Sequence, residues 1–559
     1  LTDHTTFSPV VRLTMRLALA LPVIGTGALA VALALRKCEP PLVNEDDKKI
    51  NDLLKRYKSR LLASPERLAE VEAEFLTQMR EGLSKRVVVD GKRMMMLPTF
   101  VTRLPDGTET GECYALDLGG TNFRVMHVRL GPRKGQVTAC DVEEVTLPKE
   151  IYTGPGDKLF DYLATTLKSF IDRHRAAAAA ALVPPSERSP SQQMQSSQDQ
   201  PPLPVLGFCF SFAVEQDGLA SGKLLAWTKG FSCPGVVSND PCALLSAALE
   251  RVGRPCRVAA LLNDTVGVLA AQRYLDSDTE IGVIIGTGTN ACYVERLAAL
   301  SKWEPPAGDE ASGDGRTAIN MEWGAFFSPH LPRCMEDLQV DAASPHPGKY
   351  LFEKLLSGMF LGEAARRILV SIATEVEGLF QARPKDVHAL LADARDASSG
   401  NMLEAAAATI PKPLATPGSL SSATLSAIVH DCSWGLRKTR RLLVSELGMH
   451  QPSTRAAAVV KEICTLVAKR SAQLTAMAVL AILRHNGWAD ASPPRPVTIA
   501  IDGGVYERFT AYRTMLSKAV SEQLGERSAE LFPLIKFVLS HDGSALGAAV
   551  LAAAAVTGH

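Results

Sequence analysis

The chain has 559 residues, of which 46% are hydrophobic and 21% are charged, and its 60 basic residues balance its 60 acidic ones. This length exceeds the size at which a single hydrophobic core stops growing, so we expect two lobes with a cleft between them. The balanced charge excludes a global electrostatic field that would favour nucleic acid or an anionic surface. The 11 cysteines contain no C-x-x-C pair, which predicts reduced thiols in a reducing compartment instead of a disulfide framework or a structural zinc site.

The N-terminal region contains an apolar stretch. Residues Leu17 to Leu35 carry no charge and are flanked by basic residues on both sides. Nineteen residues just span a bilayer as a helix, so we expect an uncleaved membrane anchor within residues 1–43. The alternative is a cleaved targeting peptide, because alanine, leucine and basic residues dominate. The sequence begins with Leu1 rather than Met, which leaves open whether it starts at the true N-terminus.

The rest of the chain alternates between strand-like and helical patterns, which predicts an α/β fold. Residues 44–85 show helical spacing of apolar side chains and are expected to form a helical lead-in that packs on the large lobe. We expect the small lobe at 86–262, the large lobe at 263–542, and a C-terminal helix at 543–559 that returns to the small lobe. The stretch 176–204 joins an alanine run to serine, glutamine and proline, which predicts a disordered surface insertion.

Two glycine turns, each followed by a short apolar strand, carry the first functional signal. In Asp117-Leu-Gly-Gly-Thr-Asn122 the glycines allow backbone N–H groups to approach phosphate oxygens closely. Asp117 would then lie beside a hydrated magnesium ion. The segment Gly286-Thr-Gly-Thr-Asn290 has the same character. A simple hairpin turn explains either segment alone, and no Walker loop or protein-kinase segment is present.

Asp264 is the candidate general base. It follows the apolar run Val258 to Leu262 and precedes the helical pattern Thr265 to Leu275, so it lies at a strand-to-helix junction. The alternative for such an aspartate is an N-cap. Its companions favour a carboxylate that accepts the proton of an attacking hydroxyl. A sugar needs a ring of amide, carboxylate and hydroxyl partners, and the chain offers Ser211, Thr228, Lys229, Asn290, Glu322 and Glu353.

Two later turns are suited to a nucleotide. Ile501-Asp-Gly503-Gly504 follows a strand, and His541-Asp-Gly-Ser544 precedes a helix of small residues. A helix N-terminus after a glycine turn accommodates a phosphate or a nucleotide, although turns of this kind need no ligand. None of the 11 histidines lies in an H-x-x-x-H or H-E-x-x-H array, so the sequence gives no indication of a tightly bound metal.

These segments together resemble the hexokinase family, most closely its plant and green-algal members. The similarity runs from about Met95 to Ala553 and is carried by the string from Leu206-Gly-Phe-Cys-Phe-Ser-Phe to Trp-Thr-Lys-Gly-Phe231. Gly348 to Gly362 supports it independently. The resemblance implies a two-lobed, actin-like ATPase fold with duplicated ribonuclease-H-like cores, here preceded by the N-terminal hydrophobic helix. It also implies ATP and Mg²⁺ as cofactors and phosphorylation of glucose, and of mannose and fructose, at the 6-hydroxyl.

The resemblance also implies a role for each matching residue. Asp264 would be the general base, and Lys229 would act with it. The hexose would contact Ser211, Thr228, Lys229, Asn263, Asp264, Asn290, Glu322 and Glu353. The nucleotide would contact Asp117, Leu118, Gly119, Gly120, Thr121, Asn122, Arg124, Thr287, Gly503, Gly504 and Ser544. Magnesium would arrive with ATP, with Asp117 touching its water shell.

Four positions depart from the family pattern: Ala213 replaces a usual proline, Val268 a threonine, His346 an asparagine and Ala545 a glycine. Proline limits backbone freedom, so we expect Ala213 to loosen the loop that carries Ser211 and to affect affinity more than chemistry.

Two other functions remain open at this point. A glucose sensor would bind hexose with weak or no catalysis, and a non-sugar kinase or ATPase would lack the Phe210-to-Phe231 segment. The expected location is a cytosolic kinase domain anchored on the mitochondrial outer membrane through residues 17–35, with a plastid as the alternative. No coiled-coil heptads indicate an oligomeric state.

Overall fold

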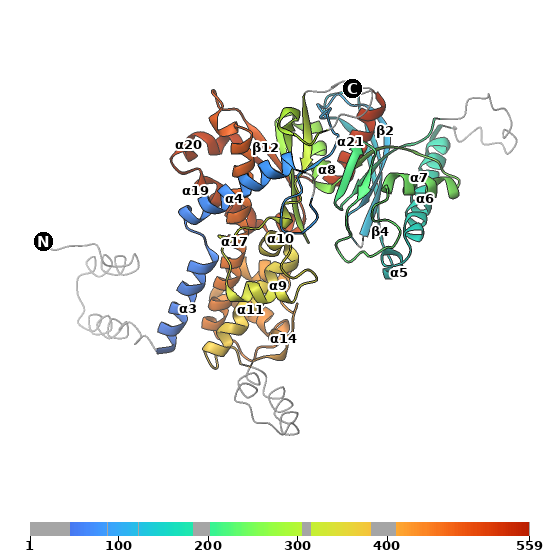
Figure 1. The fold of residues 1–559 in the computed structure, drawn as a ribbon. Coiled ribbons are helices and arrows are strands. Elements are labelled where there is room, and N and C mark those ends of the chain that lie inside the picture. Colours follow the sequence, from blue (N-terminus) through green and yellow to red (C-terminus); the bar gives the residue numbers. More distant parts are fainter. Residues whose placement is uncertain are drawn as a thin grey trace, which may run out of the picture. The chain divides into compact units, whose positions relative to one another are not determined.

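The computed structural model describes residues 45–85, 88–120, 122–182, 202–303, 315–381 and 410–557 (Figure 1). The predicted anchor at 17–35, most of the predicted insertion and Thr121 lie outside these residues. The chain divides into compact units at 1–55 and 56–559. Helix α3 (Glu45–Leu61) crosses that division, and everything below concerns the second unit.

Two β-sheets repeat one pattern of strand directions. The five-stranded sheet has the order β4-β3-β2-β5-β8, and the six-stranded sheet has the order β1-β11-β10-β9-β12-β13. In each sheet an antiparallel meander, β2-β3-β4 or β9-β10-β11, is followed by two parallel strands, β5 and β8 or β12 and β13. This repetition is the duplicated core that the sequence analysis expected.

The strands of the first sheet are β2 (Gly111–Leu118), β3 (Asn122–Leu130), β4 (Val137–Thr146), β5 (Val205–Phe210) and β8 (Arg257–Leu262). Those of the second are β1 (Leu97–Pro98), β9 (Thr279–Ile285), β10 (Thr289–Arg296), β11 (Arg316–Asn320), β12 (Val497–Asp502) and β13 (Ile535–Leu539). A separate hairpin consists of β6 (Val214–Gly218) and β7 (Ser221–Leu224).

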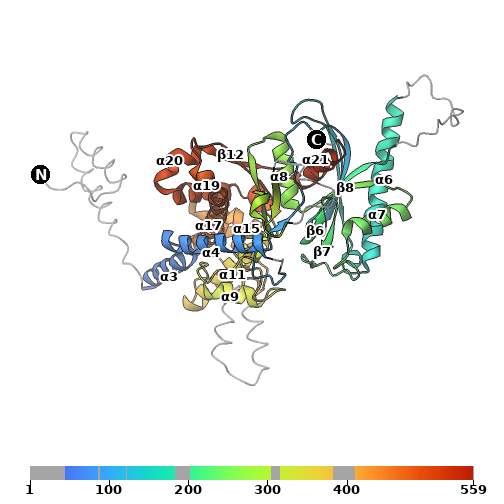
Figure 2. The ribbon, with the colours of Figure 1, turned by 45° about the horizontal axis from the view of Figure 1, so that its top comes forward.

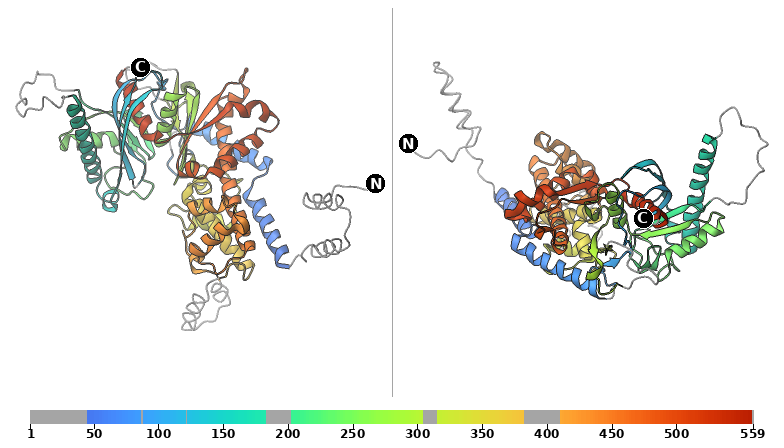
Figure 3. Two further views of the ribbon diagram at one scale, coloured as in Figure 1. Left: turned by 180° about the vertical axis from the view of Figure 1, so that it is seen from behind. Right: turned by 90° about the horizontal axis from the view of Figure 1, so that it is seen from above.

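Successive side chains along a strand point to opposite faces, so the apolar residues of these strands form a core on each face of the five-stranded sheet. Leu116 and Val125 point to one face, where they pack against α6 (Gly156–Leu182) and α7 (Pro241–Arg251). Ala115 and Met126 point to the other face, where they pack against α8 (Asp264–Leu275) and α21 (Gly543–Thr557). Figure 2 shows the C-terminal helix α21 beside α8, and Figure 3 shows it from behind, beside the strands near residue 120.

Helix α8 also connects the two sheets. Val266 and Leu269 share one apolar cluster with Ala115 of the first sheet and with Cys292 and Val294 of the second. Because both sheets bury side chains against the same helix, the start of α8 is fixed with respect to both.

The second sheet carries a larger group of helices around α17 (Thr454–His485). They are α4 (Pro65–Ser84), α9 (Met335–Ala342), α10 (Leu351–Leu356), α11 (Gly358–Glu375), α15 (Ser422–Val429), α16 (Arg437–Ser445) and α19 (Thr510–Gln523). The short helices are α5 (Lys149–Tyr152), α14 (Lys412–Ala415), α18 (Gly504–Arg508) and α20 (Ser528–Leu531). Among the described residues α17 alone is long and apolar enough to cross a membrane, and 89% of its most apolar window is buried, as in the core helix of a globular protein.

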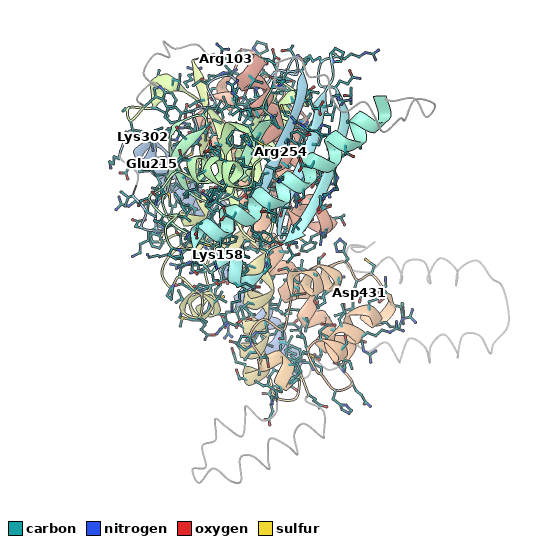
Figure 4. The ribbon with its side chains drawn as sticks, turned by 90° about the vertical axis from the view of Figure 1, so that its right-hand side faces the viewer. Arg103, Lys158, Glu215, Arg254, Lys302 and Asp431 are labelled. Atoms are coloured by element: carbon teal, nitrogen blue, oxygen red, sulfur yellow. The ribbon has the colours of Figure 1, made fainter. Side chains whose placement is uncertain are left out.

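One expectation about the insertion is wrong. The disordered stretch was expected to begin at residue 176, but α6 continues through the alanine run to Leu182. Alanine has the highest intrinsic helix propensity, so a run of alanines extends a helix that is already nucleated. Figure 4 shows α6 lying across the five-stranded sheet.

A buried ion pair fastens α17 to the helix α9. Arg470 is fully buried and its guanidinium donates to both carboxylate oxygens of Asp337, at 2.6 and 2.9 Å. Burial alone would raise the pKa of Asp337, but the charge and hydrogen bonds of Arg470 outweigh burial and hold that pKa below its ordinary value. The pair is therefore ionised at neutral pH.

Removing one partner of this pair should leave an uncompensated buried charge. We expect Asp337→Asn to destabilise the protein by about 3–5 kcal/mol, measured by denaturant unfolding of the intact chain. The control is Glu522→Gln, which breaks the exposed Lys518–Glu522 pair and should change stability by no more than about 0.5 kcal/mol. Equal effects of the two substitutions would contradict this account.

Candidate active site

Asp264 is the first residue of α8, and Asn263 is its N-cap. The Asn263 Oδ1 atom accepts hydrogen bonds from the backbone N–H of Thr265 at 3.1 Å and from its hydroxyl at 2.8 Å. The capping role considered for Asp264 thus belongs to its neighbour. The carboxylate of Asp264 accepts the Thr265 N–H with Oδ1, while Oδ2 lies 3.6 Å from the Lys229 Nζ atom.

Lys229 joins this carboxylate to the segment around Ser211. Its Nζ atom donates to the Ser211 carbonyl at 2.9 Å, and its backbone is left-handed with φ 54°. The Ser211 hydroxyl is buried and has no hydrogen-bond partner among the described residues. Thr228 precedes Lys229 in the same turn, where its carbonyl accepts the Phe231 N–H at 3.0 Å. This corner of the site therefore has an ammonium group and an unpaired buried hydroxyl.

Ala213, which replaces the usual proline, is buried in a small apolar cluster with Met95 and Leu97. Its carbonyl also accepts the Leu225 N–H at 2.9 Å. The expected loosening of the Ser211 loop stays a prediction.

An amide and carboxylate network lies on the other side of Asn263. The Asn290 Nδ2 atom lies 3.2 Å from Asn263 Oδ1, 2.8 Å from Asn320 Oδ1 and 3.2 Å from Glu322 Oε1. Asn320 Nδ2 also donates to Glu322 Oε1 at 2.9 Å. The sequence analysis did not assign Asn320 to the site. Its signal was weak: a polar residue at the end of a strand, two positions before Glu322.

Burial changes the proton affinity of Glu322. It raises the pKa to about 7, and the negative charges of Asp264 and Glu353 add to this effect against the hydrogen bond from Asn320. Burial likewise raises the pKa of Glu353. Glu322 is thus poised to gain or lose a proton near neutral pH.

The second glycine turn packs against Glu353. The Thr289 N–H donates to Glu353 Oε2 at 3.3 Å, and a Cβ on Gly288 would lie only 2.8 Å from that oxygen. Thr287 is exposed at the tip of the turn. Gly503, with φ 108°, lies so close to Ile285 that a Cβ would come within 2.6 Å of its carbonyl group. The turns at 286–290 and 502–504 are therefore neighbours, and the second turn needs glycine at position 503.

The first glycine turn is held by Asp117 at the end of β2. Ser544 Oγ donates to Asp117 Oδ2 at 2.6 Å, whereas Asp117 Oδ1 is buried without a hydrogen-bond partner among the described residues. Burial raises the pKa of Asp117. Arg124 NH1 lies 4.0 Å from Asp117 and 3.0 Å from Asp542. An unpaired buried carboxylate oxygen fits a water ligand of Mg²⁺.

Two residues of the turn, Leu118 and Gly119, lie against Ser211. A Cβ on Gly119 would lie 3.5 Å from the Ser211 hydroxyl, and Gly120 faces open space. The Leu118 carbonyl accepts the Ser211 N–H at 3.1 Å. The side chain of Asn122 has another partner: its amide donates to Glu144 on β4 at 2.6 Å.

Glycines bring α8 and α21 into backbone contact. A Cβ on Gly547 would lie 1.9 Å from the Gly267 carbonyl oxygen, and a Cβ on Gly267 would lie 2.5 Å from the Ser544 carbonyl oxygen. No larger residue fits either position without separating the helices. This contact sets the distance between Asp264 on α8 and the Asp117–Ser544 pair.

Comparisons with known proteins identify the family of this chain. Two family models, both described as Hexokinase, match residues 53–274 and 280–554. Hexokinase-1 of Nicotiana tabacum is 37% identical over 506 residues, covering 90% of this chain and 90% of that protein. Hexokinase-2 of Oryza sativa subsp. japonica is 37% identical over 503 residues, covering 90% and 91%.

A solved structure of the hexokinase from Schistosoma mansoni complexed with glucose superposes with a TM-score of 0.70 and 30% identity, covering 91% of this chain and 100% of that one. The fold is therefore the two-lobed α/β fold of this hexokinase structure, as expected. The chain belongs to the hexokinase family.

The contact between the two helices should be essential for activity. In Gly547→Ala the added Cβ must push α21 from α8, which would displace Ser544 and Asp117 relative to Asp264. We expect kcat to fall by roughly 10²-fold, the size expected for a displacement of about 1 Å, in a steady-state ADP-release assay with hexose and ATP. Thr557→Ala, at the exposed end of the same helix, should retain activity. Unchanged kcat in Gly547→Ala would show that the contact does not position the site.

The raised pKa of Glu322 predicts pH-dependent hexose binding. A carboxylate accepts hydrogen bonds from two sugar hydroxyls, whereas its protonated form accepts fewer. Affinity should therefore rise as the pH rises through about 7, and binding below that pH should release a proton. Calorimetric titrations in buffers of different ionisation enthalpy measure both effects.

The variant Glu322→Gln should bind hexose more weakly and lose this pH dependence. Glu250→Gln, on the exposed surface of α7, should keep the wild-type profile. A wild-type affinity that is constant from about pH 6 to 8 would contradict the assignment.

Proposed function

We propose that this hexokinase transfers the γ-phosphoryl group of ATP to the 6-hydroxyl of a hexose, with Asp264 as the general base. The observation that carries the proposal is the placement of the Asp264 carboxylate at the start of α8. It lies 3.6 Å from the Lys229 ammonium group and beside the Asn263–Asn290 contact that leads to the second glycine turn. A base in this position accepts the hydroxyl proton as the new O–P bond forms.

The polar groups around Asp264 would hold the sugar. Glu322 and Glu353 offer acceptors, and the Ser211 and Thr228 hydroxyls and the amides of Asn263, Asn290 and Asn320 offer both donors and acceptors. A buried hydroxyl such as that of Ser211, which lacks a partner among the described residues, gains a hydrogen bond when a ligand reaches it. This set of donors and acceptors favours a ligand with several hydroxyls in fixed directions.

The glycine turns would hold the phosphates. Backbone N–H groups at 118–120 and 286–288 would point at phosphate oxygens, and Lys229 and Arg124 would balance their negative charge. Asp117 would hold a water ligand of Mg²⁺, which neutralises charge on the β- and γ-phosphates. Gly503, Gly504 and the start of α21 would face the adenosine, while the Ser544 hydroxyl keeps Asp117 in place. The proposed contacts of Thr121 lie outside the described residues.

The finer substrate and location assignments also remain proposals. Glucose, mannose and fructose are the proposed hexoses, since the ring of amides and carboxylates would serve hydroxyls that these sugars share. A cytosolic kinase domain anchored on the mitochondrial outer membrane through residues 17–35 is the proposed location, with a plastid as the alternative. The anchor lies outside the described residues.

The substitution Asp264→Ala tests the assignment of the base. Loss of the proton acceptor should lower kcat by about 10²-fold or more, with a smaller change in hexose affinity, measured by coupled ADP release with several hexoses. Asp278→Ala removes an exposed aspartate beyond the far end of α8 and should leave kcat unchanged. Near-normal turnover of Asp264→Ala would refute the role of this residue.

A further inference from the structure

Three potential metal ligands meet on the far side of the five-stranded sheet from α8. His127 on β3, Asp141 on β4 and His174 on α6 each offer one ligand atom, and these atoms all lie within 4.8 Å of one another. His127 and Asp141 are direct cross-strand partners, so their side chains project to the same face. That face is the one covered by α6, and the rings of His127 and His174 lie 4.9 Å apart.

His127 is already oriented as a ligand. Its Nε2 atom lies 2.7 Å from Glu112 Oε1, so a carboxylate fixes the ring from behind. Its Nδ1 atom is buried and has no hydrogen-bond partner among the described residues, and it lies 3.7 Å from Asp141 Oδ2. The side chain is only 7% exposed. A buried nitrogen with no partner is costly unless a ligand uses its lone pair.

The residues around His127 also support its role as a metal ligand. A carboxylate behind a ligating histidine is the usual outer partner at zinc sites, where it sets the tautomer and the ring orientation. Arg129 contacts Glu112 at 3.3 Å, and Arg173 pairs with Glu143, so both cations are engaged with acidic groups. Asp172 pairs with Arg254, which Figure 4 shows beside α6, and this pair holds the helix near His174.

We propose that His127, Asp141 and His174 bind one divalent transition-metal ion, with zinc as the preferred metal. Two imidazoles and one carboxylate form a borderline-soft ligand set that suits Zn²⁺ better than Mg²⁺ or Ca²⁺. A tetrahedral zinc ion holds its ligand atoms about 3.3 Å apart at bond lengths near 2 Å. The three ligand atoms now lie within 4.8 Å of one another, so binding would bring them closer through rotation of His174 and of Asp141, whose side chain is 58% exposed. Water would occupy the fourth position.

Such an ion would connect three elements of the small lobe. It would fasten α6 to β3 and β4 at the end of the helix distant from Gly156. This site is separate from the proposed Mg²⁺ position beside Asp117, because it lies on the opposite face of the sheet from α8 and α21. Its expected effect is on stability, and phosphoryl transfer requires none of these three residues.

Metal titration of the tag-free full chain tests the proposal. After treatment with a chelator, ZnCl₂ is added without hexose or nucleotide, and binding is followed by calorimetry and by the melting temperature. Wild type should bind one Zn²⁺ per chain and melt at a higher temperature with the metal. His174→Gln and the more exposed Asp141→Asn should each weaken binding at least tenfold, and Glu112→Gln should weaken it about 10- to 100-fold.

Two control variants distinguish zinc binding at this site from zinc binding by other side chains. Cys140→Ser removes the exposed thiol next to Asp141, and His330→Gln removes a histidine paired with Glu70 elsewhere; both should keep wild-type affinity. Co²⁺ substitution should give a spectrum without thiolate charge-transfer bands. Equal affinity in wild type and Asp141→Asn, or binding that disappears only in Cys140→Ser, would overturn the proposal.

Discussion

The backbone contact between α8 and α21 is the constraint on which the site depends. Gly267 and Gly547 remove the side chains that would otherwise separate these helices, and Gly207 on β5 does the same, since a Cβ there would lie 2.0 Å from the Ala548 carbonyl oxygen. Three glycines from three parts of the chain thus let the C-terminal helix lie directly on β5 and on α8. As a result Ser544 reaches Asp117, and the start of α8 lies between the two sheets.

This geometry brings several buried acidic groups together. Burial raises the pKa of Asp117, Glu322 and Glu353, and it raises that of Asp502 to about 6. Lys229 and Arg124 are two of the cations placed among them. Such a site gains most from a ligand that supplies hydroxyl donors or a metal-bound phosphate, which agrees with a hexose and MgATP as substrates. The carboxylates are held for their ligands at a cost to folding.

Local signals predicted much of the fold and the site. The two glycine turns, the junction at Asp264 and the alternating strands depend on short-range chemistry, and the structure places them where the sequence analysis expected. Tertiary pairing decided the rest. Asn122 points to Glu144 on the neighbouring strand, and Asn320 joins the network through Asn290. The three ligands of the proposed metal site are far apart in sequence, so no spacing motif could reveal them.

The most direct test of the central claim is a crystal structure with glucose and a non-hydrolysable ATP analogue. The account predicts that an Asp264 carboxylate oxygen lies at hydrogen-bond distance, roughly 2.6–3.2 Å, from the glucose 6-hydroxyl. It also predicts that this hydroxyl faces the γ-phosphate held between the two glycine turns. Glucose bound with its 6-hydroxyl turned away from Asp264, or a γ-phosphate outside both turns, would contradict the account.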